Sequence, residues 1–191
     1  MTMQGKLIVF TAPSGSGKTT IVKHILSTFP DTAFSVSATT RNKRSRETHA
    51  KDYYYLSVET FKSWVSMDAF AEWEEVYEGQ FYGTPKSEIE RLTQCGKHVV
   101  FDVDVKGALS IKNLYPEETL AVFIKVPSIK EIEKRLRSRG HDDEESIKKR
   151  LAKATHELTY ESQFDAVLLN DNLQKTLRDA EDIVQKFLHL G

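Results

Sequence analysis

Short apolar runs alternate along this chain with segments whose apolar residues repeat at helical spacing. The run Leu7–Thr11 is bounded by Gly5 and Pro13, a pattern typical of a buried strand. A helical pattern follows, and Pro30 ends it. Three more buried strands are predicted, at 98–103, 120–126 and 164–169. Buried strands that alternate with helices indicate an α/β fold, a parallel sheet wrapped by helices.

Capping residues mark the ends of other predicted helices. Ser128 and Glu131 form a capping-box signature at the start of a charged helix. Thr84 is predicted as the N-cap of a further helix, with Pro85 at its first position and Gly96 just past its end. A long C-terminal helix is predicted from apolar residues that share one side: Leu177, Ile183, Val184, Phe187 and Leu188.

Two segments interrupt this alternation. Residues 37–84 contain mixed polar and aromatic runs, Tyr53–Val58 and Phe70–Val76, which predict a small, half-exposed sheet. Residues 127–158 are helical in pattern and rich in charge. We therefore expect one domain over residues 1–191 with two inserted lobes, at about 37–84 and 127–158, and a core at about 1–36, 85–126 and 159–191.

Composition narrows the class of protein. The 191 residues carry a formal net charge of −1, which argues against a surface built to hold a nucleic acid. Cys95 is the single cysteine, so an intrachain disulfide or a thiolate metal cluster is excluded. The apolar run near the start is too short for a signal peptide, and no run approaches a membrane span. A cytoplasmic protein without a membrane partner is the expectation.

Residues 12–19 match the phosphate-loop pattern, with Ala12 where the first glycine usually stands. Gly15 and Gly17 allow the backbone N–H groups to turn inward around a phosphate, and the following helix adds its positive end. Lys18 is expected to reach the β and γ phosphates, and Thr19 to give its hydroxyl directly to Mg²⁺. The residues expected to bind ATP here are Ala12, Pro13, Ser14, Gly15, Ser16, Gly17, Lys18, Thr19 and Thr20.

A phosphate loop alone does not identify a reaction, but further motifs follow it. They are Ser37-Ala-Thr-Thr-Arg41-Asn-Lys-Arg44, Phe70-Ala-Glu72-Trp73, Phe81-Tyr82-Gly83-Thr84, Phe101-Asp102-Val-Asp104-x-x-Gly107, Glu133-Lys-Arg135-Leu-x-x-Arg139-Gly140 and a lid motif around Arg150. In their order and spacing these motifs resemble the guanylate kinase family over nearly the whole chain. The resemblance implies a phosphate-loop nucleoside-monophosphate kinase fold, with a GMP-binding lobe at 37–84 and a helical lid at 127–158.

The resemblance implies a GMP site in the first lobe. Its 5′-phosphate grip would comprise Arg41, Arg44, Tyr53 and Tyr82, which supply guanidinium and phenol donors. Glu72 would accept from N1–H and the exocyclic amine of guanine, Asp104 would add an acceptor, and the hydroxyls of Ser37 and Thr84 would donate to O6. Adenine would leave Glu72 facing a lone pair, and a site of this kind rejects the wrong base by about 10⁴-fold or more.

The expected reaction is transfer of the ATP γ-phosphoryl group to GMP or dGMP, without a covalent intermediate or a dedicated base. Lys18, Arg41, Arg135, Arg139 and Arg150 would neutralise the phosphoryl group during transfer. Two further roles follow from the resemblance: Asp102 would hold Mg²⁺ through a water molecule, and Asn170 would join Arg135 in binding ATP. Small molecules are the expected partners, and the chain is expected to be a monomer or a homodimer.

Several alternatives stay open at this point. The basic run from Arg41 could be a solvent-exposed loop, and Arg135 and Arg139 could belong to a salt-bridged helix with Glu131 and Glu133. The chain could also be a catalytically inactive guanylate-kinase-like binding module, or a kinase for another nucleoside monophosphate. Two positions depart from the family: Thr84 stands where serine is common and keeps the hydroxyl, and Lys106 stands where glutamine is common, with an effect that the sequence leaves open.

Overall fold

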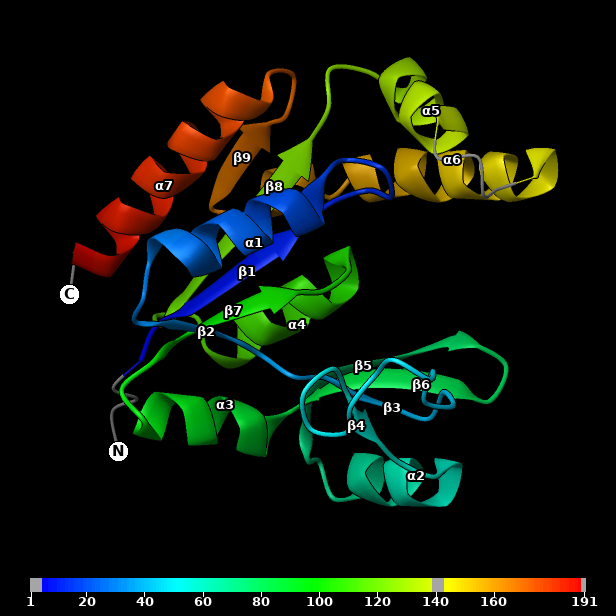
Figure 1. The fold of residues 1–191 in the computed structure, drawn as a ribbon, viewed down its shortest axis with the longest axis vertical. Helices are drawn as coiled ribbons and strands as arrows, with labels where there is room; N and C mark the ends of the chain where they lie inside the picture. The colour runs from blue at the N-terminus through cyan, green and yellow to red at the C-terminus, as the bar shows by residue number, and fades with distance from the viewer. Residues whose placement is uncertain (1–4, 139–142, 190–191) are drawn as a thin grey trace.

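A five-stranded parallel sheet forms the centre of the molecule (Figure 1). The computed structural model describes residues 5–138 and 143–189. The strand order is β2-β7-β1-β8-β9, and every neighbouring pair is parallel, as the alternating pattern predicted. The strands are β1 (Leu7–Thr11), β2 (Thr32–Phe34), β7 (His98–Asp102), β8 (Thr119–Lys125) and β9 (Ala166–Leu169).

Helices cover both faces of this sheet, and as a result every residue of the central strand β1 is buried. Ile8 and Phe10 pack in a cluster with α1 and α7, whereas Leu7 and Val9 pack on the other face with α3 and α4. Strand residues alternate between faces, so one fully apolar strand can serve both clusters. These helices are α1 (Lys18–Thr28), α3 (Lys86–Gln94), α4 (Val105–Leu114) and α7 (Leu173–His189).

A second sheet, of four strands, projects from the core together with α2 (Figure 1). Its order is β4-β3-β6-β5, and it has a small core of its own in which Phe61 stacks on Phe70 and Phe81, at ring distances of 4.4 and 5.4 Å. The elements are β3 (Ala38–Thr39), β4 (Tyr54–Tyr55), α2 (Val58–Ser66), β5 (Phe70–Tyr77) and β6 (Gln80–Pro85).

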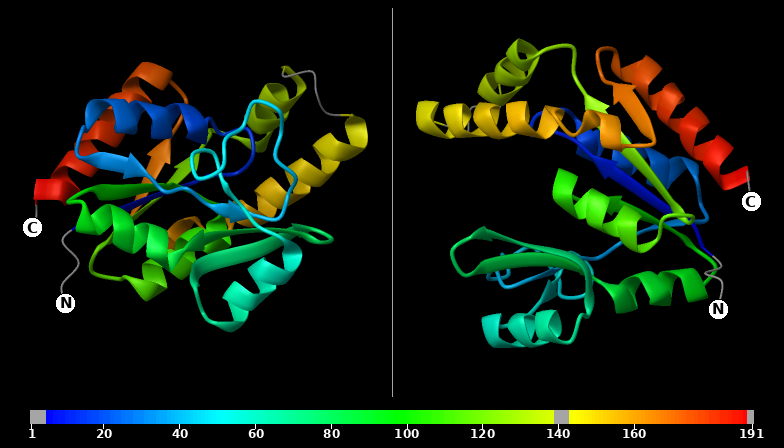
Figure 2. Two further views of the ribbon diagram at one scale, coloured as in Figure 1. Left: turned by 60° about the horizontal axis from the view of Figure 1, so that its bottom comes forward. Right: turned by 180° about the vertical axis from the view of Figure 1, so that it is seen from behind.

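Two helices, α5 (Ile129–Ser138) and α6 (Glu144–Leu158), form the other projection. They share a cluster of Val126, Ile132, Leu136 and Ala154. A short 3₁₀ turn at Glu161–Gln163 leads from α6 back to β9. Figure 2 shows that this helix pair and the second sheet extend from the same side of the core. Among the described residues, no helix has the length and apolar content that a membrane span requires.

Two predictions about local structure were wrong. Thr84 and Pro85 end β6 rather than cap a helix, and α3 begins at Lys86, because the Thr84 hydroxyl donates to Glu72 instead of capping. The predicted strand Tyr53–Val58 is extended only at its start. Ser57 caps α2, since its Oγ accepts from the Thr60 backbone N–H at 3.1 Å.

Candidate functional site

The loop between β1 and α1 has the backbone that its sequence predicts. Gly15 and Gly17 both adopt left-handed conformations, with φ of 88° and 86°. A Cβ atom at Gly17 would lie 2.5 Å from the side-chain nitrogen of Asn170. That nitrogen donates to the carbonyl of Ser16 at 2.7 Å, so the buried Asn170 supports the loop from behind. Glycine at position 17 is therefore required both by its backbone angle and by this close approach.

The loop lines a cavity of about 490 Å³. Residues Ala12 to Thr20, for which ATP binding was predicted, all contribute to its wall. The opposite wall comes from the two projections and from the start of α4. Its residues are Tyr77, Asp104, Arg150, Lys153 and Glu157.

Lys18 and Asp102 meet beside the loop, and Lys18 lines the larger cavity whereas Asp102 lines a smaller cavity next to it. The ammonium group of Lys18 lies 2.6 Å from Oδ1 of Asp102 and donates to the carbonyl of Val103 at 2.7 Å. Asp102 ends β7, and its neighbour in the sheet is Phe10 of β1, so the parallel register places it beside the loop. Both groups are thus at the carboxyl edge of the sheet, where ligands bind in folds of this class.

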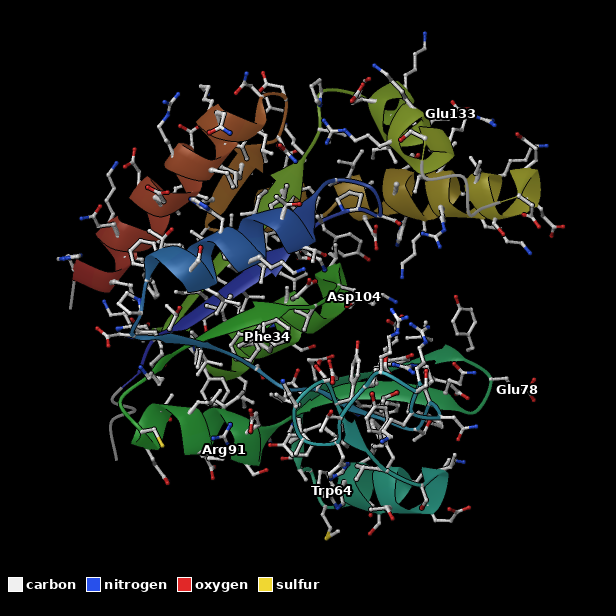
Figure 3. All side chains as sticks on the ribbon, viewed as in Figure 1. Phe34, Trp64, Glu78, Arg91, Asp104 and Glu133 are labelled. Carbon is white, nitrogen blue, oxygen red and sulfur yellow. The ribbon has the colours of Figure 1, made fainter. Side chains whose placement is uncertain are left out.

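A second, smaller cavity of about 160 Å³ lies next to the first and shares Asp104 with it. Figure 3 shows Asp104 on the side of the core that faces the β5–β6 hairpin. The structure brings five of the predicted acceptor residues to its wall: Ser37, Tyr53, Glu72, Tyr82 and Asp104. These residues come from the second sheet, the loop before it and the core, so the tertiary fold creates this cavity.

Glu72 is held at this wall by close neighbours. The hydroxyl of Thr84 donates to Oε1 of Glu72 at 2.6 Å, across the antiparallel pair β5–β6. A Cβ atom at Gly107 would lie 2.9 Å from Oε2 of Glu72, so only glycine leaves room for the carboxylate. Asp104 caps α4, because its Oδ1 accepts from the backbone N–H of Gly107 at 2.8 Å.

Burial and neighbouring acids disfavour negative charge in this cavity. Burial raises the pKa of Glu72 to about 7, and the nearby Asp104 adds to that rise, although the hydrogen bond from Thr84 opposes it. Burial and a hydrogen bond with Asp104 also raise the pKa of Glu74. Lys106 is exposed, and its positive charge opposes the rise in the pKa of Glu74. A ligand that donates hydrogen bonds to carboxylates would suit such a cavity.

Arg41 forms a bidentate salt bridge beside the cavity. Its two terminal nitrogens donate to the two carboxylate oxygens of Glu47, each at 2.9 Å, and the guanidinium lies 5.4 Å from the ring centre of Tyr53. This pairing lowers the pKa of Glu47 to about 2. Arg44 is exposed on the same loop. Arg41 is therefore oriented by a partner instead of being a freely solvated side chain.

The three arginines that were predicted to belong to a lid, Arg135, Arg139 and Arg150, differ in what the structure shows of them. Arg150 of α6 donates to the hydroxyl of Ser14 at 3.0 Å and so contacts the phosphate loop directly. Arg135 of α5 pairs with Glu131 at 2.9 Å, as the salt-bridge alternative expected, and also donates to the carbonyl of Asn170 at 3.0 Å. Arg139 lies outside the described residues.

Two oxygen-bearing side chains near the loop could bind the expected magnesium ion. The available groups are the exposed hydroxyl of Thr19 and the carboxylate of Asp102, both of which are hard oxygen donors. Among the described residues, no group of three or more histidine, cysteine or acidic side chains is placed to hold a metal ion without a further ligand. The two oxygen donors at Thr19 and Asp102 are of the kind that a magnesium ion prefers.

Sequence reasoning missed four polar side chains of these cavities, besides Val76, Gly83 and Val103. Lys153 and Glu157 follow Arg150 on α6 at spacings of three and seven, which places them on one helix face and could have indicated them. Tyr77 comes from the hairpin end of β5, and Glu74 from the same strand as Glu72 at the spacing that shares a sheet face.

Comparison with known proteins gives a consistent result. A family model described as guanylate kinase matches residues 4–187. The chain is 43% identical to the guanylate kinase of Bacteroides thetaiotaomicron over 98% of this chain and 92% of the relative, and 43% identical to that of Porphyromonas gingivalis over 96% and 98%. The crystal structure of guanylate kinase from Anaplasma phagocytophilum matches with a TM-score of 0.72 at 28% identity, covering 95% of this chain and 86% of that one.

Proposed function

The chain belongs to the guanylate kinase family, and from that premise we propose the roles of its residues in transferring the γ-phosphoryl group of ATP to GMP. The products are ADP and GDP. The observation that carries this assignment of roles is a pair of adjoining cavities, one lined by a phosphate loop and one with an acidic edge, which share Asp104.

We assign the smaller cavity to guanine. Glu72 accepts hydrogen bonds from N1–H and the exocyclic amine, and Asp104 offers a further acceptor at the same edge. Ser37 donates to O6. The Thr84 hydroxyl has a single proton, which it donates to Glu72 in this structure, so its expected bond to O6 requires that proton to turn from Glu72 when guanine binds. The second nucleotide that we expect to be accepted is dGMP. AMP is rejected because its N1 lone pair would leave a buried carboxylate unpaired.

Arg41, Arg44, Tyr53 and Tyr82 form the grip on the acceptor's 5′-phosphate. In this structure Arg41 is paired with Glu47, and an incoming phosphate dianion would share or replace that carboxylate. Tyr53 and Tyr82 lie edge to face, with ring centres 6.0 Å apart, and both line the acceptor cavity. The two phenols therefore line the cavity before a ligand arrives, whereas Arg41 is paired with Glu47 and Arg44 is exposed, so the two arginines would have to turn towards the phosphate on binding.

Donor binding uses the larger cavity. The backbone of residues 12–20 surrounds the phosphates, and Lys18 turns from Asp102 towards the β and γ oxygens. Arg135, Arg139 and Arg150 stabilise charge on the phosphoryl group as its bond to ADP breaks and its bond to the GMP phosphate forms. Asn170 shapes the ATP site by supporting the loop at Ser16, and a direct contact with adenine stays a prediction.

Magnesium would be held by Thr19 directly and by Asp102 through water, together with the nucleotide phosphates. It supplies charge neutralisation at the β and γ oxygens. Asp102, 2.6 Å from the ammonium of Lys18, keeps that cation beside the loop until a phosphate is present.

We further propose that the two projections act as separate mobile parts: a GMP-binding lobe at about 37–84 and a lid at about 127–158, on a core of the remaining residues. Their separate apolar clusters support this division. Closure of both parts over the core would exclude water, which otherwise competes as phosphoryl acceptor.

A coupled assay of ADP formation tests the assignment. Purified protein with Mg-ATP should turn over GMP fastest and dGMP next, with AMP, UMP and dTMP far slower. Glu72→Gln should reduce the preference for GMP over AMP by about 10²-fold or more while leaving ATP binding unchanged. An absence of GMP-dependent turnover would favour a binding module, and an unchanged preference in the variant would refute the role of Glu72.

A further inference from the structure

One face of α6 contributes three side chains to the phosphate cavity. Arg150, Lys153 and Glu157 lie at spacings that place them on the same side of the helix. Arg150 already contacts the phosphate loop through Ser14, so this face is directed at the loop in the present conformation. Figures 1 and 2 show α6 and the β5–β6 hairpin extending from the same side of the core.

Lys153 differs from Lys18 in how firmly it is held. Its ammonium lies 3.8 Å from Oε1 of Glu157, beyond hydrogen-bond distance, and its side chain is 56% exposed. Lys18, in contrast, has a carboxylate at 2.6 Å and a carbonyl at 2.7 Å. The cation on Lys153 can therefore move to a ligand without breaking a close hydrogen bond.

The walls of the two cavities place Lys153 close to the acceptor site, because Lys153 and Asp104 both line the phosphate cavity and Asp104 also lines the acceptor cavity. In agreement with this placement, the charge of Lys153 opposes the rise in the pKa of Glu157 on its own helix and the rise in the pKa of Glu74, which lines the acceptor cavity. Glu157 is 7% exposed, and burial is the main cause that raises its pKa. Lys153 thus lies near the junction of the donor and acceptor cavities, where the phosphoryl group must cross.

We propose that Lys153 is a further catalytic cation that contacts the phosphoryl group in transit, with Glu157 as its positioning residue. The proposal rests on the function proposed above. The bond from the γ-phosphorus to the bridging oxygen breaks, its electron pair stays on ADP, and a bond to a GMP phosphate oxygen forms. Lys153 transfers no proton, and its ammonium neutralises the equatorial oxygens as charge spreads over them.

Steady-state kinetics of five variants test this role. Lys153→Met keeps the side-chain length without the charge and should lower kcat about 10-fold or more, with the KM of each substrate within about threefold of wild type. Lys153→Arg should recover most of that loss. The matched control is Lys149→Met on the same helix, because Lys149 is 76% exposed and pairs with Glu145 at 2.7 Å, away from the cavity. It should remain within about twofold of wild type.

Glu157→Gln should lower kcat less than Lys153→Met does, and the double variant should lose no more than Lys153→Met alone, because the carboxylate acts through the lysine. The melting temperature of each variant, measured by thermal unfolding, distinguishes a loss of catalysis from a loss of folded structure. A kcat for Lys153→Met within twofold of wild type, or failure of Lys153→Arg to recover activity at unchanged melting temperature, would overturn the proposal. Loss of GMP turnover in the wild-type protein would instead overturn the proposed function.

Discussion

Glu72 takes its chemical character from the residues around its carboxyl group. A hydroxyl from Thr84 orients one oxygen, and the missing side chain of Gly107 leaves space for the other. Burial and the nearby Asp104 disfavour the charged form. A carboxylate held in this way gains most from a ligand with two adjacent N–H donors, which is the pattern on guanine.

The pH dependence of stability should report this environment. The pKa of Glu72 is raised from 4.5 to about 7, so between those values the folded protein holds more protons than the unfolded chain. Stability therefore falls as pH rises through this window. Relative to Glu72→Gln, the wild-type free energy of unfolding should fall by about 2 kcal/mol from about pH 5 to about pH 8, as measured by urea denaturation. Parallel pH curves for the two proteins would contradict the raised pKa.

At the scale of elements, the strand–loop–helix unit from β1 to α1 depends on tertiary support. The loop adopts left-handed backbone at Gly15 and Gly17, and Asn170, which follows β9, holds it in place. The sequence pattern identified the glycines, but the close approach of Asn170 depends on where β9 lies in the sheet. A side chain at position 17 would disturb both the backbone and this support.

Gly17→Ala should therefore weaken ATP binding, and the loss of affinity should be larger than the loss of folding stability can explain. The matched control is Gly96→Ala, since Gly96 has a φ of 71° and nothing within 4 Å of its added Cβ. Each variant should lose about 1 kcal/mol of stability from the left-handed backbone. Only Gly17→Ala should weaken ATP binding, by about 10-fold or more in calorimetry, because the loop's donors are displaced. Equal ATP affinity in both variants would count against the loop geometry.

At the scale of the whole molecule, each of the two cavities is built from several parts of the chain. The second sheet and the α5–α6 pair each have a separate apolar cluster, and Asp104 of the core is shared by both cavities. Closure of both parts would bring the acceptor phosphate to the donor phosphate. Such motions are common in enzymes that must keep water from a reactive phosphoryl group.

Small-angle scattering should detect this closure. The radius of gyration should fall most when GMP and an unreactive ATP analogue are both bound, and less with either alone, because each ligand bridges the core to one part only. Calorimetry would establish saturation in each sample. An unchanged scattering curve with both ligands bound would show that the described conformation is already the closed one.

The sequence by itself determined the parallel sheet and the phosphate loop. Leu7–Thr11 and Leu120–Val126 are continuous apolar runs, and such runs have few arrangements other than strands buried on both faces. The loop is local too, because its glycines, lysine and threonine act within a few residues of each other. The acceptor residues were predicted through family resemblance, since periodicity alone gives Glu72 no special status.

Only the tertiary structure decided how the wall of the smaller cavity around Glu72 is built and where α6 lies. Thr84 looked like a helix cap, but its hydroxyl donates across the β5–β6 pair to Glu72, a partner that local sequence does not reveal. Ser57 in turn starts a helix where a strand was predicted. Lys153 and Glu157 enter the phosphate cavity because α6 packs over the loop. These contacts join residues far apart in the chain, and their energies depend on burial that exists only after folding.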